Sequence, residues 1–149
     1  MSQAHKKKGR ISRKAAKPAK ERRKRDNRSP LTENELAKQI VDAAYRVHTT
    51  LGPGLLESVY ESVLAYELEH RGLLTRQQPV PLVYHGVHIE VGFRVDLIVE
   101  DLAIVEIKSV KKQLLTHLRL ANKRLGLLIN FNVALIKDGI TRVANGLSE

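Results

Sequence analysis

Apolar positions between residues 36 and 51 repeat every three or four residues, which is the spacing of one helical face. The repeat consists of Leu36, Ile40, Ala44, Val47 and Leu51. Thr32 and Glu35 precede it at the separation of a capping box, in which each side chain bonds the other residue's backbone N–H. The pattern predicts a helix over about 32–50. The run Gly52-Pro53-Gly54 ends it, because Pro lacks the N–H donor and Gly permits a sharp reversal.

A second helix is expected from about Leu55 to Arg71, with Gly72 as its C-terminal cap. Two neighbouring apolar stripes run along it, and both supply inward positions. The first stripe holds Leu56, Val59, Val63 and Tyr66, and the second holds Tyr60, Leu64 and Leu68. An acidic residue, Glu57, begins the second stripe, three residues before Tyr60.

After Gly72 the period of the apolar positions changes to two, which is typical of β-strands. The expected strands cover residues 79–84, 87–99 and 102–108, with reversals at His85-Gly86 and near Glu100-Asp101. This predicts a three-stranded antiparallel meander.

The rest of the chain continues with one helix and further strands. A helix is expected over 113–122, with Leu114, Leu118 and Ala121 on one face. Residues 125–131 are apolar almost throughout, as in a strand covered on both sides. Asp138-Gly139 indicates a hairpin turn between strands 133–137 and 140–143. The order α, α, β, β, β, α, β, β predicts an α/β (α+β) domain, a mixed sheet with helices flanking it.

Two carboxylates stand on adjacent predicted strands. Asp96 and Glu106 lie opposite each other if the reversal at Asp101 has an odd-length loop or a bulge. A two-residue turn at Glu100-Asp101 would instead place them on opposite faces of the sheet. Glu106 and Lys108 end an otherwise apolar row of their strand.

Carboxylates that face each other directly repel unless a cation joins them. Lys108 supplies part of that charge and a divalent ion the remainder. Hard oxygen ligands without imidazole or thiolate suit Mg²⁺ or Mn²⁺ rather than zinc. The structural alternative is that Asp96, Glu106 and Lys108 form a solvated, salt-bridged strand edge. The six histidines show no metal-ligand spacing, so surface or packing roles are expected for them.

Charge is distributed unevenly between the start of the chain and the remainder. Residues 1–29 hold 13 Lys and Arg against two acids, whereas residues 30–149 are close to neutral. This predicts a disordered basic arm over 1–29, because it has too little apolar surface to offset its conformational entropy, and a single domain over 30–149. The arm favours nucleic acid as a partner through phosphate contacts. Those contacts are expected from Lys6, Lys7, Lys8, Arg22, Arg23, Lys24 and Arg25. A solubilising tail, a contact with an anionic membrane and a start codon assigned too far upstream are the alternatives.

Composition excludes several classes of chemistry. The chain has no cysteine, so disulfides, thiol nucleophiles and iron–sulfur clusters are ruled out. No apolar run approaches the ~20 residues that span a bilayer, and the start of the chain lacks the apolar region of a secretory signal. We therefore expect no membrane span and a cytoplasmic location.

Four separated blocks resemble the GxxExxY proteins of the PD-(D/E)XK nuclease-like superfamily. They are Gly54-Leu-Leu-Glu57-Ser-Val-Tyr60, Phe93-Arg-Val-Asp96-Leu-Ile-Val, Ile104-Val-Glu106-Ile-Lys108 and Gly126-Leu-Leu-Ile-Asn-Phe-Asn132. The resemblance covers about residues 32–147. It implies a restriction-endonuclease-like core and a metal-dependent nuclease that hydrolyses nucleic-acid phosphodiester bonds.

The resemblance also implies a role for each site residue. Asp96, Glu106 and the Ile107 carbonyl would hold Mg²⁺ or Mn²⁺, and Lys108 would orient the attacking water or neutralise the transition state. Glu57 matches an additional helix-borne acid that completes the metal shell or supports it. Tyr60, with its ring in the core and its hydroxyl near Glu57, and Gln113 would belong to the surroundings of the site.

One departure from the family pattern lies directly after Lys108. The segment that leads into the next helix is shortened to Val110-Lys111-Lys112, and His117 stands where the family commonly has Tyr. Lys111 and Lys112 could add phosphate contacts. The shortening leaves open an alternative function, a catalytically inactive nuclease-fold module that binds nucleic acid or regulates. The sequence also leaves open DNA or RNA as substrate, endo- or exonucleolytic cleavage, and whether the chain forms a homodimer, as many superfamily members do.

Overall fold

A computed structural model describes residues 29–77, 79–108 and 111–147. The chain divides into two units, Met1–Pro30 and Leu31–Glu149. Residues 1–28, which hold the basic clusters of the predicted arm, lie outside the described residues. Every helix and strand below belongs to the second unit. Within the described residues no helix combines the length and the apolar character needed to cross a membrane.

Helix α2 (Glu33–Leu51) forms as the sequence predicts. The capping box is confirmed, because the Glu35 N–H donates to Thr32 Oγ1 (3.1 Å) and the Thr32 N–H donates to Glu35 Oε2 (2.8 Å). The helix ends at Gly52, whose φ of 69° is left-handed and whose N–H bonds the His48 carbonyl (2.8 Å). Its buried face consists of Leu36, Ala37, Ile40, Ala43, Ala44 and Val47.

Helix α3 (Glu57–His70) buries only one of its two predicted stripes. Its buried residues are Tyr60, Leu64, Ala65 and Leu68, and Gly72 with a φ of 87° follows the helix. The prediction that the other stripe faces inward is wrong for Leu56, Val59 and Tyr66, which are exposed. A helix of this length has a single face against α2 and the sheet, so the second stripe turns to solvent.

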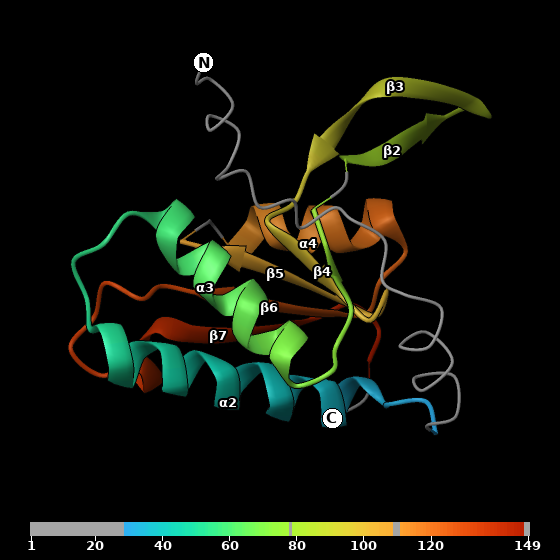
Figure 1. Ribbon diagram of the computed structural model, residues 1–149. Helices are drawn as coiled ribbons and strands as arrows, with labels where there is room; N and C mark the ends of the chain where they lie inside the picture. Colours follow the sequence, from blue (N-terminus) through green and yellow to red (C-terminus); the bar gives the residue numbers. More distant parts are fainter. Residues whose placement is uncertain (1–28, 78, 109–110, 148–149) are drawn as a thin grey trace, which may run out of the picture. The chain divides into compact units, whose positions relative to one another are not determined.

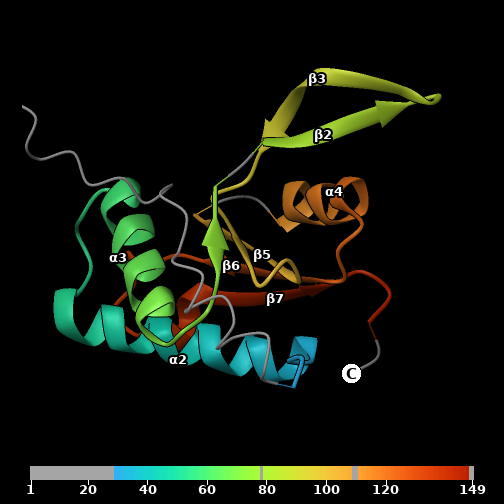
Figure 2. The same ribbon diagram turned by 45° about the vertical axis from the view of Figure 1, so that its right-hand side comes forward.

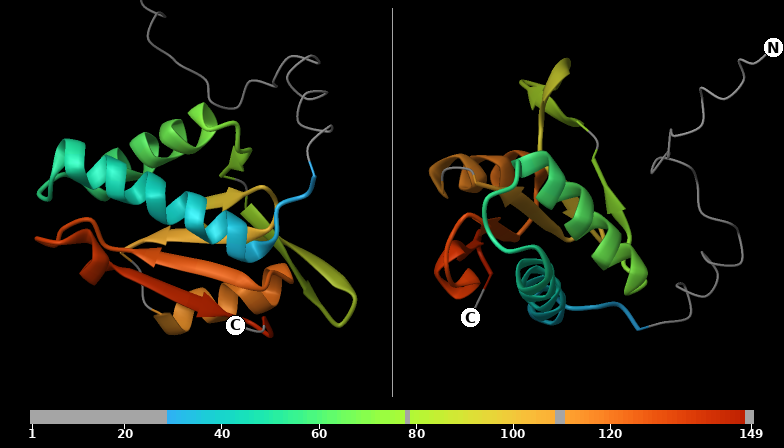
Figure 3. Two further views of the ribbon diagram at one scale, coloured as in Figure 1. Left: turned by 90° about the horizontal axis from the view of Figure 1, so that it is seen from below. Right: turned by 60° about the vertical axis from the view of Figure 1, so that its left-hand side comes forward.

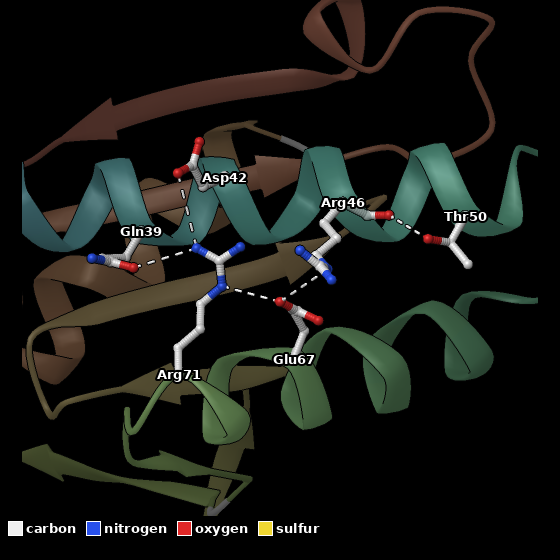
Figure 4. A network of polar contacts seen from close by, with 6 residues as sticks. All are labelled: Gln39, Asp42, Arg46, Thr50, Glu67 and Arg71. Carbon is white, nitrogen blue, oxygen red and sulfur yellow. Dashed lines mark hydrogen bonds and ion pairs between the residues drawn. The ribbon is translucent and has the colours of Figure 1, made fainter.

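A polar network joins α2 to the C-terminal end of α3 (Figure 4). Arg71 contacts Gln39 and Asp42 of α2 and Glu67 of α3, and Arg46 of α2 approaches the same Glu67 oxygen (3.8 Å). The network links the C-terminal end of α3 to the middle of α2.

The described strands form a five-stranded sheet and a separate two-stranded sheet. The larger sheet has the order β1 (Thr75–Arg76), β4 (Leu97–Val99), β5 (Ala103–Ile107), β6 (Leu125–Ile129) and β7 (Ile140–Ala144). Strands β5 and β6 run parallel and the other neighbours run antiparallel. Helices α2 and α3 cover one face, and α4 (Lys111–Ala121) covers the other (Figures 1 and 3). This is the predicted mixed sheet flanked by helices.

The core is divided by the sheet. The larger cluster packs α2 and α3 against Leu97, Val99, Val105 and the inner face of β6. The smaller cluster lies under α4, where Leu114 and Leu118 contact Ile98 and Ile104. Alternate residues of β4 and β5 therefore face different helices.

The predicted meander is wrong at its middle strand. Residues 87–99 form two strands, β3 (Val87–Arg94) and β4, interrupted at Val95-Asp96. Strand β3 pairs only with β2 (Pro79–Tyr84) in the described part of the chain, and this hairpin extends away from the larger sheet (Figures 1 and 2). The short strand β1, which the pattern did not predict, pairs with the edge of β4 that faces away from β5.

The predicted hairpin near residue 138 is also wrong. Residues Ile136–Gly139 form a 3₁₀ helix, η2, and β7 pairs with β6 instead of with residues 133–137. Gly139 lies outside the left-handed region, and a Cβ there would stand 2.1 Å from the Asn130 carbonyl oxygen. Gly139 is thus required by close packing and makes no hairpin turn.

Candidate active site

The turn between β4 and β5 decides whether the two predicted carboxylates meet. Glu100 and Asp101 both have left-handed φ values (53° and 56°), and the Leu102 N–H donates to the Val99 carbonyl (3.0 Å). These are the features of a two-residue type I′ turn. Val99 nevertheless pairs with Ala103, so Leu102 is an extra residue and forms a bulge.

The bulge sets the register of the whole strand pair. Leu97 is the partner of Val105, which is the register predicted to bring Asp96 toward Glu106, and the pairing ends at Leu97, directly after Asp96. Of the two predicted alternatives, the bulge is confirmed. Glu106 lies on the α4 side of the sheet, where it meets His117, and Asp96 is bonded to the last residue of β5. Both acids thus stand at the end of β5, where parallel strands of α/β proteins commonly present functional residues.

Asp96 is partly buried directly before β4. Its Oδ2 accepts a hydrogen bond from the Ile107 backbone N–H (2.7 Å). Burial raises the pKa of the Asp96 carboxyl, and the negative charge of Glu57 raises it further, whereas the Ile107 N–H and His117 act in the opposite direction. The Ile107 bond attaches Asp96 to the last residue of β5.

Glu106 is a buried carboxylate on β5, with 5% of its surface exposed. Its Oε2 lies 2.5 Å from Nδ1 of His117 on α4, and His117 is itself only 7% exposed. Burial raises the pKa of Glu106 and the charge of Asp96 adds to this, while the bond and charge of His117 lower it. Asp96 is thus close enough to raise the cost of ionising Glu106.

Lys108 follows the last residue of β5 and leaves the strand geometry. Its φ is 55°, and its backbone N–H donates to the Ile129 carbonyl of β6 (2.8 Å). The strand therefore ends at Ile107, and the prediction that Lys108 continues the row of Glu106 is wrong. The exposed ammonium instead lies 3.7 Å from Oε2 of Glu57, the first residue of α3.

Tyr60 takes a structural position one turn into α3. Its ring is fully buried and stacks on Phe131, with ring centroids 4.7 Å apart. Its hydroxyl donates to the Gly52 carbonyl (2.6 Å) and accepts from the Leu55 N–H (3.1 Å). The core position of the ring is confirmed, while the hydroxyl, predicted near Glu57, is bonded to the loop that leads into α3.

The remaining predicted residues begin α4 or lie outside the described part. Lys111, Lys112 and Gln113 are exposed in the first turn of α4. The segment between Lys108 and α4, residues 109–110, is outside the described residues, as are the seven basic residues of the arm.

The donors at this site can be matched to the needs of a divalent cation. Asp96, Glu106 and the Ile107 carbonyl are hard oxygen donors, and two carboxylates with raised pKa values form a pair that a cation stabilises. In the described ranges, however, no three His, Asp or Glu side chains gather as a metal-binding group. Glu57 stands beside Lys108 at this site. The residues fit a cation held by two carboxylates, with water and substrate oxygens completing its shell.

His117 is the site residue that the spacing rules missed. Those rules find ligand pairs within one helix or strand, whereas His117 of α4 bonds Glu106 of β5. Its position was nonetheless visible in the pattern, since it lies three residues after Leu114 and one before Leu118, on the apolar face of α4.

Comparison with known families adds one finding. The family model described as the PD-(D/E)XK nuclease superfamily matches residues 34–143. The match extends from α2 to β7 and includes Glu57, Asp96, Glu106 and Lys108. No curated protein and no solved structure matches the chain.

Proposed function

The chain belongs to the PD-(D/E)XK nuclease superfamily, and from this premise we propose that it hydrolyses nucleic-acid phosphodiester bonds with Mg²⁺ or Mn²⁺. One observation carries the proposal: Asp96 is bonded to the Ile107 N–H at the end of β5, between Glu106 and Lys108, and its charge acts on Glu106. This is the constellation that gives the superfamily its name. Within the superfamily we assign the chain to the GxxExxY proteins, on Gly54, Glu57 and Tyr60.

The roles of the residues follow from their chemistry. A divalent ion at Asp96 and Glu106 would supply charge stabilisation at the scissile phosphate and acidify a bound water. Asp96 and Glu106 would each bind the cation through one carboxylate oxygen. The other oxygen of Asp96 accepts from the Ile107 N–H, and that of Glu106 is bonded to His117 Nδ1. Lys108 is an exposed point charge that can turn from Glu57 toward a phosphate.

Glu57 and Tyr60 connect the GxxExxY motif to this chemistry. The Tyr60 hydroxyl bonds both sides of the loop that precedes α3, and so holds the first residue of the helix in place. That residue, Glu57, keeps Lys108 at the site and adds negative charge near Asp96. We propose that Glu57 supports the metal shell in this way.

Binding of the substrate is assigned to the basic residues. The seven Lys and Arg of the arm, together with Lys111 and Lys112, would contact phosphates without reading sequence. A cytoplasmic location agrees with the cysteine-free composition. A homodimer would bring two sites to a duplex, and sedimentation of the chain with and without DNA would count the copies.

A second function is favoured by one observation. The segment that joins Lys108 to α4 is short, since α4 already begins at Lys111. A shortened segment beside the site suits a module that binds nucleic acid without cleaving it. This alternative predicts salt-dependent binding and no cation-dependent cleavage.

The two functions are separated by cleavage assays on the full chain. Labelled single-stranded and duplex DNA and RNA are incubated with Mg²⁺, with Mn²⁺ or with EDTA. For a nuclease we expect Glu106→Gln and Asp96→Asn to lose cleavage by about 100-fold or more, because 1.4 kcal/mol of lost charge stabilisation already costs tenfold. Binding, measured by fluorescence anisotropy in EDTA, should stay within about threefold.

Asp42→Asn is the matched control, since Asp42 is an exposed acid of α2 whose contact is with Arg71 and not with the site residues. It should cleave as the wild type does. Cleavage that survives both site variants would exclude these acids and point to a contaminating nuclease. Binding without cleavage in every condition would establish the alternative.

A further inference from the structure

Glu106 and His117 form a polar contact inside a mainly apolar part of the core. Both side chains are more than nine-tenths buried, and Nδ1 lies 2.5 Å from Oε2. Ile104 on β5 and Leu114 and Leu118 on α4, which precede or flank the two residues on the same elements, belong to the smaller apolar core cluster. A buried carboxylate in such a layer is costly unless it is hydrogen-bonded. An ionised carboxylate can only accept, so the imidazole N–H donates.

The two carboxylates of the site are held in the same manner. Asp96 uses Oδ2 to accept from the backbone of β5, and Glu106 uses Oε2 to accept from a side chain of α4. Each acid therefore has one oxygen fixed by the protein. A glutamate has one more rotatable bond than an aspartate, so without a partner its carboxylate would sample more orientations.

Helix α4 determines where the imidazole stands. Leu114 and Leu118 are fully buried against the sheet, and their contacts with the Gly126 position fix the helix above β5 and β6. His117 lies on the same face, between these two anchors. The imidazole is therefore presented to Glu106 by a packed element and not by a loop, which keeps its position precise.

Resting on the proposed function, we propose that His117 is a positioning residue for the metal-dependent reaction: it holds Oε2 of Glu106, so that Oε1 is directed at the cation. His117 does not itself touch the cation or the substrate. Residues that orient metal ligands in this way commonly change metal affinity 10–100-fold when they are replaced.

Three replacements of His117 separate positioning from packing. His117→Leu fills the space and removes the donor. His117→Asn places an amide N–H near the position of Nδ1, and His117→Gln places one nearer the position of Nε2. The full chain and each variant are titrated with Mn²⁺ in a calorimeter, after circular dichroism and thermal unfolding have compared their folds. His70→Leu is the control, since His70 is an exposed histidine of α3.

We expect His117→Leu to weaken Mn²⁺ binding by about 10–100-fold. His117→Asn should stay within about threefold of the wild type, His117→Gln should fall between the two, and His70→Leu should have no effect. If His117→Leu does not fold, the proposal is still tested by whether His117→Asn binds Mn²⁺ more tightly than His117→Gln. In a Glu106→Gln background, His117→Asn and His117→Gln should no longer differ in Mn²⁺ binding, because no carboxylate is left to orient.

The outcomes that overturn the proposal differ from those that overturn the function. A folded His117→Leu chain that binds Mn²⁺ like the wild type excludes positioning and leaves the nuclease intact. Equal losses in the Leu and Asn variants assign His117 to packing alone. A wild-type chain that neither binds Mn²⁺ nor cleaves any substrate overturns the proposed function, and the role of His117 falls with it.

Discussion

At the scale of single residues, Lys108 combines a strained backbone with the chemical role proposed for it. Its φ of 55° is a conformation that costs a non-glycine residue about 1 kcal/mol. The strand cannot relax it, because the Lys108 N–H is bonded to the Ile129 carbonyl of the neighbouring strand (2.8 Å). His85, Glu100, Asp101 and Asn122 share this conformation, so the strain by itself assigns Lys108 no role.

Two variants of Lys108 separate strain from chemistry. Lys108→Ala removes the amine and keeps the strain, whereas Lys108→Gly removes both. We expect the glycine variant to be more stable than the alanine variant by about 1 kcal/mol, although both lose the amine and cleave equally poorly. Urea unfolding at equilibrium measures the difference. An alanine variant as stable as the glycine variant would show that the backbone there is relaxed.

Gly139 occupies a position that has no room for a Cβ atom. The nearest atom to a Cβ at this position would be the Asn130 carbonyl oxygen at 2.1 Å, and that backbone cannot move aside because the Asn130 N–H bonds the Gly139 carbonyl (2.8 Å). Gly139→Ala should lower the free energy of unfolding by about 1–3 kcal/mol. Gly126→Ala is the comparison, since its Cβ would meet flexible leucine methyl groups at 3.0–3.1 Å. Thermal unfolding that ranks Gly126→Ala as the worse variant would contradict this account.

At the scale of elements, the turn between β4 and β5 is tied to the rest of the sheet by Asp101. Its carboxylate bonds Arg76 of β1 and lies 3.1 Å from Lys123, just after α4. Burial raises the pKa of Asp101, but the hydrogen bonds and charges of Lys123 and Arg76 outweigh it, and the pKa falls below its ordinary value. The folded state thus favours the ionised carboxylate.

The lowered pKa of Asp101 makes the stability of the fold depend on pH. Because the folded pKa lies below the unfolded one, the stabilisation by Asp101 is present above the ordinary value of 3.8 and is lost as the pH falls through the lowered pKa. Asp101→Asn should therefore lower the free energy of unfolding at pH 7, by no more than about 1 kcal/mol for so exposed a pair. The loss should shrink toward zero in acid. Denaturant unfolding from pH 7 downward measures it, with Asp138→Asn as an exposed control; a constant difference at all pH values would refute the linkage.

The elements that sequence could not predict share one physical cause. Alternation of apolar residues runs through Val95 and Asp96 without a break, so the pattern cannot show that β3 and β4 belong to different sheets. Strand β1 has two residues, too few for any period. Asp138-Gly139 has the composition of a turn, but tertiary packing against Asn130 determines its conformation. Local patterns failed where distant contacts decide the structure.

At the scale of the whole molecule, charge and chemistry occupy different parts of the chain. The arm carries 13 Lys and Arg, while residues 30–149 are nearly neutral and hold the carboxylates. Affinity for nucleic acid and cleavage should therefore respond to different substitutions.

Neutralising Arg22, Arg23, Lys24 and Arg25 together with Gln should test this separation. Each lost phosphate contact should reduce the slope of log affinity against log salt by about 0.9 for duplex DNA. Fluorescence anisotropy over a salt series measures the slope. Lys38→Gln, an exposed change on α2, should leave it unaltered. An unchanged slope in the fourfold variant would assign the arm a role other than phosphate binding.

The candidate site was predictable in its residues and incompletely predictable in its geometry. Asp96 and Glu106 were identified together with the two registers open to them, and only the bulge at Leu102 decides between these registers. The Lys108 contact with Glu57 depends on a left-handed backbone that residue type does not reveal. His117 could have been found from the apolar face of α4, but its partner could not, because that requires knowing which strand the helix covers.

The extra residue at Leu102 has a consequence for the inheritance of this site. Side chains alternate along a strand, so the parity of the number of residues between Asp96 and Glu106 determines whether their carboxylates share a face. The identities of the turn residues have no such effect. Over generations an exchange of one amino acid in this turn should alter stability, as at Asp101, and keep the register, whereas the gain or loss of a single codon should be rejected. Insertions or deletions of two residues should survive there, because they preserve this parity.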